Sequence, residues 1–300
     1  MSRLDFDIAV FAVNDAATIG ACIQSTDRAC SGKNAHISVL LNGTTDNTIE
    51  ILRDIMPTNA ALTVYWFPVA DKANAINHFL YELRREARVH ICVDAYTRIG
   101  GASFRAMAAS IEADPKAMIA SALPVGGRSA KSVAANTMKG GMVNGLCYGL
   151  RPDFVHRMVE AGFRLPLQLY RVDGLLGSMG AHDLDSMNTI WDDTRLIGVE
   201  DARFALKPLS IFKMDDIRRQ YNWEIRQARG RMENAAIKLL IYAGGYGALP
   251  DNANHMIRNW MMVNRPSSRT MREKYFMNMA VRQLLHSKDL KASRPEIISL

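Results

Sequence analysis

Short apolar runs alternate with helical stretches in the opening third of the chain, and this alternation constrains the fold more than any other feature. The apolar runs lie at residues 6–14, 36–43, 62–69 and 89–94, and amphipathic stretches separate them. Strands that are connected through helices lie parallel in one sheet, and the helices cover both of its faces. The sequence therefore predicts an α/β fold with a mainly parallel sheet.

The composition agrees with a large buried core and gives no sign of a membrane span. The chain has 300 residues, of which 48% are hydrophobic, and it contains no uncharged apolar run of about eighteen residues. It begins MSRLDFDIAVF, which enters a strand pattern without room for a secretory signal. The four cysteines have no metal-ligand spacing, so we expect reduced, buried thiols and a cytoplasmic protein.

The positive charge of the chain is concentrated in its C-terminal third. Residues 203–300 contain 18 Lys and Arg against 8 Asp and Glu, whereas the rest of the chain carries a small negative surplus. A basic segment of this kind suits a polyanionic partner, such as a diphosphate, an anionic lipid or a nucleic acid. It also suits a solvated helical face, and beyond about residue 218 the pattern is helical.

Candidate binding residues lie at the ends of the predicted strands, where a parallel sheet binds ligands. The carboxyl ends of parallel strands meet at one edge, so Val13, Asn42, Lys72 and Asp94 should line one crevice. Asn42 offers a carbonyl acceptor and an amide donor to a ligand at this edge. Lys72 adds a positive charge at the start of a helix.

Four motifs at these strand ends resemble glycosyltransferase family 2, the nucleotide-sugar transferases of the GT-A fold. In chain order they are AVND (12–15), NGTTDNT (42–48), DKANAIN (71–77) and VDAYTRI (93–99). The resemblance covers roughly residues 6–235. It implies a GT-A catalytic domain at 1–215, with a donor half at about 1–115 and an acceptor half at about 116–215, and a basic helical extension at 216–300. It also implies that Val13, Asp15, Asn42, Lys72 and Asp94 bind the nucleotide.

Tyr96 departs from the family pattern, which has a second carboxylate at this position. A phenol is a poor ligand for Mg²⁺ or Mn²⁺. We expect Asp94 to hold Mg²⁺ or Mn²⁺ weakly, with help from water and the diphosphate. The alternative is that arginine and lysine stabilise the leaving group without a metal. A third interpretation is that activity has been lost.

Two acidic residues compete for the role of general base in an inverting transferase. RLPLQLYRVDGLLGSMG (164–180) resembles the family stretch around the base, which favours Asp173. GVEDARFALKP (198–208) contains Glu200 and Asp201, but its alternating pattern resembles the strand that follows the base. We therefore prefer Asp173 to Asp201.

Two arginines of the C-terminal third extend the predicted donor site. EIRQARGR (224–231) loosely resembles the Gln-x-x-Arg-Trp motif of processive synthases, although it lacks the Trp. Arg226 and Arg229 lie three residues apart on one helical face and could reach a diphosphate.

The sequence as a whole predicts a soluble, cytoplasmic glycosyltransferase that moves a sugar from a UDP donor to a hydroxyl of a glycan or lipid acceptor. A sugar-phosphate nucleotidyltransferase is the alternative enzyme, but its glycine-rich loop after the first strand is not present. A degenerate domain that binds nucleotide sugar or nucleic acid is the non-enzymatic alternative, although no nucleic-acid motif is found. Methionines and Trp260 in the C-terminal helices predict an apolar stripe that contacts an anionic membrane, its own domain or a second copy in a homodimer.

Overall fold

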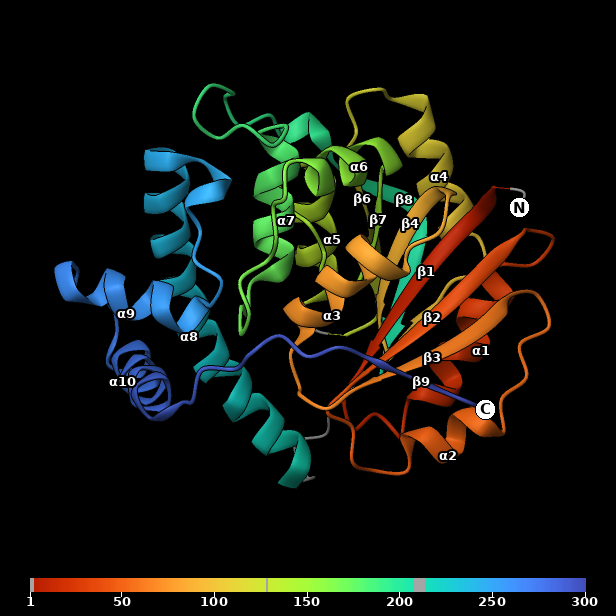
Figure 1. Ribbon diagram of the computed structural model, residues 1–300, viewed down its shortest axis with the longest axis horizontal. Coiled ribbons are helices and arrows are strands. Elements are labelled where there is room, and N and C mark those ends of the chain that lie inside the picture. The colour runs from red at the N-terminus through yellow and green to blue at the C-terminus, as the bar shows by residue number, and fades with distance from the viewer. Residues whose placement is uncertain (1–2, 128, 208–213) are drawn as a thin grey trace.

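A single mixed sheet forms the centre of the computed structural model, which describes residues 3–127, 129–207 and 214–300 (Figure 1). The spatial order of its nine strands is β5-β8-β6-β7-β4-β1-β2-β3-β9. The strands are β1 (Leu4–Ala12), β2 (Ala35–Asn42), β3 (Ala61–Phe67), β4 (Ala87–Asp94), β5 (Thr97–Ile99), β6 (Ile119–Val125), β7 (Cys147–Leu150), β8 (Leu196–Leu206) and β9 (Glu296–Ile298).

The four strands predicted in the opening third are confirmed, and they are parallel. β4, β1, β2 and β3 lie side by side, with Phe11 of β1 opposite Asp94 of β4 and Ala12 opposite Leu41 of β2. Their carboxyl ends therefore meet at one edge, as predicted. Beyond β4 the sheet is mixed, because β7 runs antiparallel to both of its neighbours, β4 and β6.

Helices cover both faces of the sheet, and side chains of β1 alternate between the two resulting cores. Phe6, Ile8 and Val10 pack into the core that also contains residues of α1 and α4. Ala9 and Phe11 pack into the opposite core, with residues of α3, α6 and α7. The helices are α1 (Ile19–Ala29), α2 (Thr48–Arg53), α3 (Lys72–His78), α4 (Ser103–Ala113), α5 (Ala130–Met138), α6 (Pro152–Glu160), α7 (Val172–Ala181), α8 (Met214–Gly244), α9 (Ala253–Val263) and α10 (Met271–His286). A π-helical turn, Phe79–Leu83, extends α3, and short 3₁₀ turns lie at Asp193–Arg195 and Tyr246–Ala248.

The middle of the chain is rich in glycine and still forms regular elements. The region 120–190 contains most of β6 and all of α5, β7, α6 and α7. Its glycine pair at 140–141 adopts positive φ angles between α5 and β7, so these glycines mark a turn and not a long loop.

The C-terminal helices form a small core of their own before the chain returns to the sheet. Ile225 and Met232 of α8 pack with Ile257 of α9 and with Met277 and Leu284 of α10. After α10 the chain crosses to the far edge of the sheet, where β9 pairs antiparallel with β3 (Figure 1). The helices were predicted, but the strand at the end of the extension was not. The predicted boundary at 215–216 falls in the first turn of α8.

Two further features concern the cysteines and the apolar character of the helices. All four cysteines are buried and free of disulfides, as expected. Among the described residues, no helix combines the length and the apolar character that a membrane crossing requires.

Candidate functional site

An ion pair between Asp94 and Lys72 lies at the carboxyl edge of the parallel strands. Asp94 ends β4 and Lys72 begins α3, and the Lys72 Nζ atom lies 2.5 Å from Asp94 Oδ1. α3 begins here because the Asp71 carboxylate caps it, accepting hydrogen bonds from the backbone nitrogens of Ala73 and Asn74. The predicted proximity of Lys72 and Asp94 is therefore observed.

The Lys72 ammonium faces several electron-rich groups. Its Nζ atom lies 3.4 Å from the carbonyl oxygen of Gly145 and 5.6 Å from the centre of the Phe11 ring. Burial alone would lower the pKa of Lys72, but the adjacent Asp94 carboxylate outweighs this effect and raises the pKa. Lys72 is therefore a fixed positive charge at neutral pH.

The Tyr96 hydroxyl is hydrogen-bonded to the second carboxylate oxygen of Asp94. The phenol donates a 2.9 Å hydrogen bond to Asp94 Oδ2. Burial of the hydroxyl and the negative charge of Asp94 raise the pKa of Tyr96 well above its usual value, so the phenol keeps its proton. Both carboxylate oxygens of Asp94 are thus engaged by the protein itself.

Asp173, the predicted base, lies beside the same ion pair. It is the second residue of α7, and its side chain packs against Gly145 so closely that a Cβ atom built there would come within 2.9 Å of Asp173 Oδ2. Gly145 also faces Lys72, and the charge of Asp173 contributes to the raised pKa of that lysine. The alternative base, Asp201, is an exposed residue of β8. Lys72, Asp94 and Asp173 therefore converge around Gly145.

The loops after β1 and β2 are joined by hydrogen bonds. Asn14, at a φ of 50°, accepts hydrogen bonds at Oδ1 from the backbone nitrogens of Thr45 (2.8 Å) and Asp46 (3.2 Å). Asp46 accepts from the Ala16 nitrogen at Oδ2 and from Thr48 at Oδ1. Asp46 therefore has a structural role in the turn before α2.

Asp15 is the second carboxylate at this edge. It accepts a 2.9 Å hydrogen bond from the backbone nitrogen of Val13, whose side chain is exposed. Burial, together with the negative charges of Asp94 and Asp46, raises the pKa of Asp15 to about 6, although the hydrogen bond from Val13 acts in the opposite direction. Asp15 is thus protonated in part just below neutral pH.

Asn42 is more enclosed than its predicted role requires. The residue is 5% exposed, and its side-chain nitrogen donates to the carbonyl oxygen of Leu40 at 3.3 Å. Its Oδ1 atom has no hydrogen-bond partner among the described residues. A contact with a nucleobase stays a prediction for this residue.

The two predicted arginines of α8 differ in their surroundings. The Nε atom of Arg229 lies 2.8 Å from the fully buried carboxylate of Glu233, and its guanidinium also donates to the Gln168 carbonyl oxygen. Arg226 is exposed, lies 5.8 Å from the centre of the Tyr170 ring and forms no ion pair with a described residue. Arg226 is therefore free to meet a ligand, whereas Arg229 is held in the interior.

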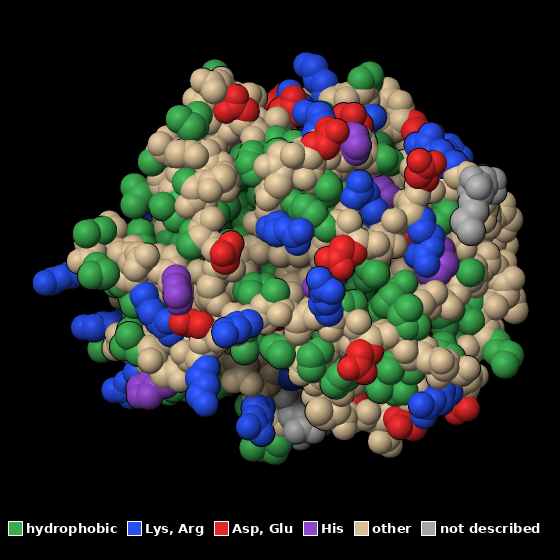
Figure 2. Space-filling model, viewed as in Figure 1, with side chains coloured by type: hydrophobic (Ala, Val, Ile, Leu, Met, Phe, Trp, Pro, Cys, Tyr) green, Lys and Arg blue, Asp and Glu red, His purple; other side chains and the backbone are tan. Residues whose placement is uncertain are grey.

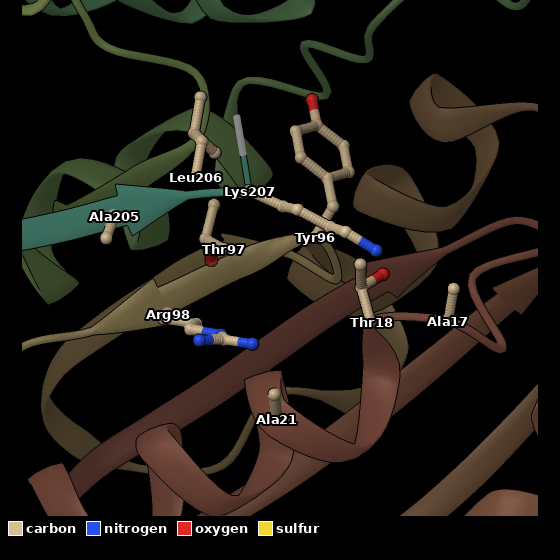
Figure 3. Close-up of a pocket in the computed structure, with 9 residues that line it drawn as sticks. All are labelled: Ala17, Thr18, Ala21, Tyr96, Thr97, Arg98, Ala205, Leu206 and Lys207. Atoms are coloured by element: carbon tan, nitrogen blue, oxygen red, sulfur yellow. The ribbon is translucent and has the colours of Figure 1, made fainter. Parts of the chain in front are cut away.

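A small pocket is lined in part by Tyr96, whose hydroxyl contacts Asp94. Its volume is about 180 Å³, and it lies between the start of α1 and the paired strands β5 and β8 (Figure 3). Arg98 and Lys207 are the charged residues of its lining. Figure 3 shows both side chains extending toward the α1 side of the pocket. The pocket is smaller than most ligand pockets, so it can hold part of a ligand.

Solved structures share this architecture. The mannosyltransferase PcManGT from Pyrobaculum calidifontis, in complex with GDP-Man and Mn²⁺, superposes with a TM-score of 0.56 at 16% sequence identity, covering 95% of this chain and 82% of that one. S. aureus TarS 1–349, in complex with UDP-GlcNAc, gives a TM-score of 0.55 at 13% identity, covering 94% of this chain and 80% of that one. The chain has the GT-A fold of nucleotide-sugar transferases. No protein-family model matches the sequence, and no curated protein matches it significantly.

The structure brings some of the predicted site residues together and separates others. In this chain the predicted Lys72, Asp94 and Asp173 come together, whereas Arg229 is committed to Glu233. Gly145 and Tyr170 were not predicted. Gly145 lies in the turn before β7, where the sequence has no recognised motif. The contact of Tyr170 with Arg226 joins segments far apart in the sequence.

Proposed function

We propose that the protein is an inverting glycosyltransferase that moves a sugar from a UDP donor to a hydroxyl of a glycan or lipid-linked acceptor. The observation that carries the proposal is the convergence of Lys72, Asp94 and Asp173 at one point of a GT-A fold. A cation, a strand-end carboxylate and a second carboxylate are the groups that such a transfer requires.

The proposed reaction is a single displacement at the anomeric carbon. Asp173 accepts the proton of the acceptor hydroxyl while that oxygen forms a bond to the anomeric carbon and the bond to the diphosphate oxygen breaks. The electron pair of the broken bond leaves with the diphosphate. The Lys72 ammonium stabilises this developing negative charge, and attack from the opposite side inverts the anomeric configuration.

The leaving group is assigned to Lys72 because the described residues do not fit a divalent cation at Asp94. Lys72 and Tyr96 take both oxygens of that carboxylate, and the described part of the chain has no group of three or more His, Cys, Asp or Glu side chains arranged for a metal. A cation at Asp94 would have to compete with these two contacts. This favours metal-independent transfer over the weakly held Mg²⁺ or Mn²⁺ at Asp94 that the sequence predicts.

The proposal places the nucleotide against the loops after β1 and β2. Val13 and Asp15 would contact the nucleoside, and Asn42 would approach the base through its unpaired Oδ1 atom. Arg226, exposed beside Tyr170, would meet the diphosphate from the opposite side. UDP is the proposed nucleotide; the two structural neighbours were solved with a GDP sugar and a UDP sugar.

Peripheral attachment to the inner face of a membrane is the proposed location. The basic residues of α8, α9 and α10 would meet anionic head groups, and the exposed Met262 and Met271 would enter the interface. Part of the predicted stripe packs internally, because Met256 and Met277 are buried. A homodimer contact at the same exposed residues is the alternative arrangement.

A donor screen tests the function directly. UDP-glucose, UDP-N-acetylglucosamine and GDP-mannose would be incubated singly with the protein, and released nucleotide diphosphate would be measured with Mn²⁺ and with excess EDTA. We expect release from a UDP sugar in both conditions. No release from any donor would contradict the enzymatic proposal, and release with Mn²⁺ alone would contradict the assignment of the leaving group to Lys72.

A further inference from the structure

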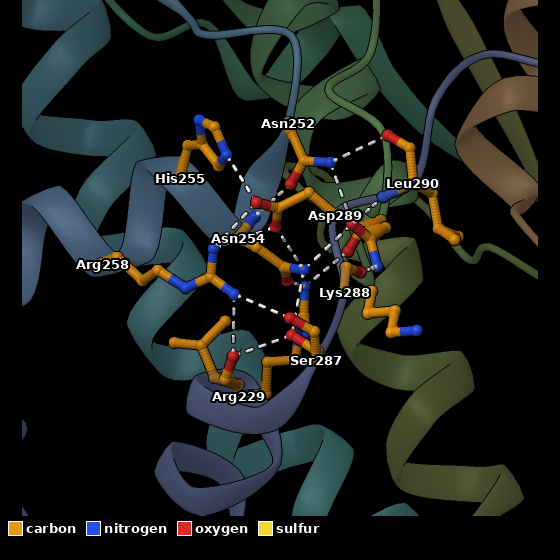
Figure 4. A network of polar contacts seen from close by, with 11 residues as sticks. Arg229, Asn252, Asn254, His255, Arg258, Ser287, Lys288, Asp289 and Leu290 are labelled. Atoms are coloured by element: carbon orange, nitrogen blue, oxygen red, sulfur yellow. Dashed lines mark hydrogen bonds and ion pairs between the residues drawn. The ribbon is translucent and has the colours of Figure 1, made fainter.

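Gln168 lies at the centre of a polar network that joins the turn before α7 to the C-terminal segment. Its Oε1 atom accepts hydrogen bonds from Asn252 Nδ2 (2.9 Å), Asn254 Nδ2 (2.9 Å) and the Leu290 backbone nitrogen (3.0 Å). Its Nε2 atom donates to the carbonyl oxygen of Lys288 at 3.1 Å. Figure 4 shows Lys288 and Leu290 beside the two asparagines at the start of α9. One side chain thus holds two segments that are far apart in sequence.

The backbone of Gln168 is held as firmly as its side chain. Its φ angle is 61°, in the left-handed region that non-glycine residues rarely adopt. Its carbonyl oxygen accepts a 2.6 Å hydrogen bond from Arg229, which in turn pairs with the buried Glu233. An unfavourable backbone conformation persists where the surrounding contacts over-determine it.

The backbone nitrogen of Gln168 connects this network to Lys72. It donates a 2.7 Å hydrogen bond to Asp71 Oδ2, while Asp71 Oδ1 accepts from the Ala73 nitrogen at the start of α3. Asp71 immediately precedes Lys72, so the position of its carboxylate fixes the first turn of the helix from which Lys72 extends. The C-terminal segment contacts the same turn again, because Asn74 Nδ2 donates to the Ser293 carbonyl oxygen at 2.9 Å.

We propose that Gln168 is a positioning residue: it carries the C-terminal segment 287–290 to Asp71 and thereby sets Lys72 at the distance from Asp94 that the donor diphosphate needs. The proposal rests on the proposed function, since Lys72 is taken as the diphosphate contact. Under this proposal the C-terminal segment 287–290 has a role in donor binding, although none of its residues contacts the Lys72–Asp94 ion pair.

A double-mutant cycle on UDP affinity tests this role. Gln168→Gly removes the side-chain contacts and suits the positive φ, so it adds no backbone strain. Gln168→Glu keeps an acceptor oxygen for Asn252, Asn254 and Leu290 but puts a carboxylate oxygen against the Lys288 carbonyl oxygen, so it should restore the affinity only in part. His255→Ala is the matched control: His255 belongs to the same C-terminal network through Asp289, 2.7 Å away, and has no contact with Gln168 among the described residues. Each variant would be titrated with UDP by calorimetry, alone and with Lys72→Ala.

We expect Gln168→Gly to weaken UDP binding about fivefold in the wild-type background and to have no effect when Lys72 is already alanine. Equal weakening in both backgrounds, or no weakening in either, would overturn the positioning role while leaving UDP binding intact. If Gln168→Gly does not fold, Asp71→Asn replaces it. Asp71→Asn puts a side-chain amide opposite the Gln168 nitrogen, and the same pattern of coupling to Lys72 is expected. Absence of UDP binding to the wild-type protein would instead refute the proposed function, and this inference with it.

Discussion

The Asp94 carboxylate has a hydrogen-bond donor on each of its two oxygens. Lys72 contacts one oxygen and Tyr96 the other, so a divalent cation at Asp94 would compete with a charged donor and a neutral one. In this structure the Asp94 carboxylate orients the Lys72 ammonium. At the residue scale, Tyr96 adds a hydrogen-bond donor beside that carboxylate.

The general base gives the first prediction at this scale. Asp173→Asn preserves the shape of the side chain and removes its ability to accept a proton, so turnover should fall by about a hundredfold or more while UDP affinity stays nearly unchanged. Asp201→Asn is the matched control, because Asp201 is exposed on β8. Steady-state rates and UDP titrations would be compared. A nearly normal Asp173→Asn enzyme beside an inactive Asp201→Asn enzyme would reverse the assignment.

Neutralising Asp15 should increase the free energy of unfolding, whereas neutralising Asp46 should decrease it. The folded-state pKa of Asp15 is raised to about 6, mainly by burial, so its ionisation opposes folding above that pH, and the penalty fades as pH falls from 6 toward 3.8. Hydrogen bonds from Thr48 and Ala16 outweigh the burial of Asp46 and lower its pKa. Its charge therefore stabilises the fold above pH 3.8, and that contribution is lost in acid.

Thermal unfolding at two pH values tests this pair. Asp15→Asn should raise the melting temperature at pH 7.5 and raise it much less at pH 4.5. Asp46→Asn should lower the melting temperature at pH 7.5. A lower melting temperature for Asp15→Asn at pH 7.5 would show that its hydrogen bond with Val13 outweighs the cost of the buried charge.

At the scale of elements, the first turn of α7 meets the loop before β7 at a single glycine. A Cβ atom on Gly145 would come within 2.9 Å of the Cβ, Cγ and Oδ2 atoms of Asp173, and such a contact forces the carboxylate to move. Gly145→Ala should therefore lower turnover about as much as a misplaced catalytic group does, on the order of a hundredfold.

A second glycine provides the control for this prediction. A Cβ atom on Gly101 would meet no atom within 4 Å, so Gly101→Ala should leave turnover near the wild-type value. Both variants would be assayed with the active donor, and UDP affinity would be measured in parallel. Normal turnover in Gly145→Ala would show that Asp173 can move away without consequence, which contradicts its role as the base.

The sequence predicts the parallel half of this sheet well because each strand is a local apolar run with a helical stretch after it. Lys72 and Asp94 could be found for the same reason, since Lys72 begins the helix after β3 and Asp94 is the last residue of β4. β9 has three residues, and its pairing with β3 depends on tertiary contacts alone. Gly145 and Gln168 were missed because their roles come from neighbours distant in sequence, Asp173 in one case and Leu290 in the other.

At the scale of the whole molecule, the basic C-terminal third contributes positive charge to the surface and also contacts that hold the fold together. Its arginines include the exposed Arg226, a candidate ligand contact, and the internal Arg229, which is held by Glu233. Figure 2 shows Lys and Arg side chains gathered over the side of the molecule where the C-terminal helices lie, with few acidic ones among them. The C-terminal third then returns to the sheet, where β9 pairs with β3. The last strand therefore belongs to the same sheet as the predicted donor-binding edge.

Titration with UDP measures the central claim, that this edge of the GT-A fold binds a nucleotide diphosphate through Lys72. Wild-type protein, Lys72→Ala and the control Lys274→Ala would be compared by calorimetry in buffer containing EDTA. Lys274 is an exposed residue of α10, so its replacement removes the same charge far along the chain from the ion pair. We predict that the wild-type protein and Lys274→Ala bind UDP equally, and that Lys72→Ala binds it about tenfold or more weakly because Asp94 then faces the diphosphate without its cation. No heat with the wild-type protein, or equal affinity in Lys72→Ala, would contradict the claim.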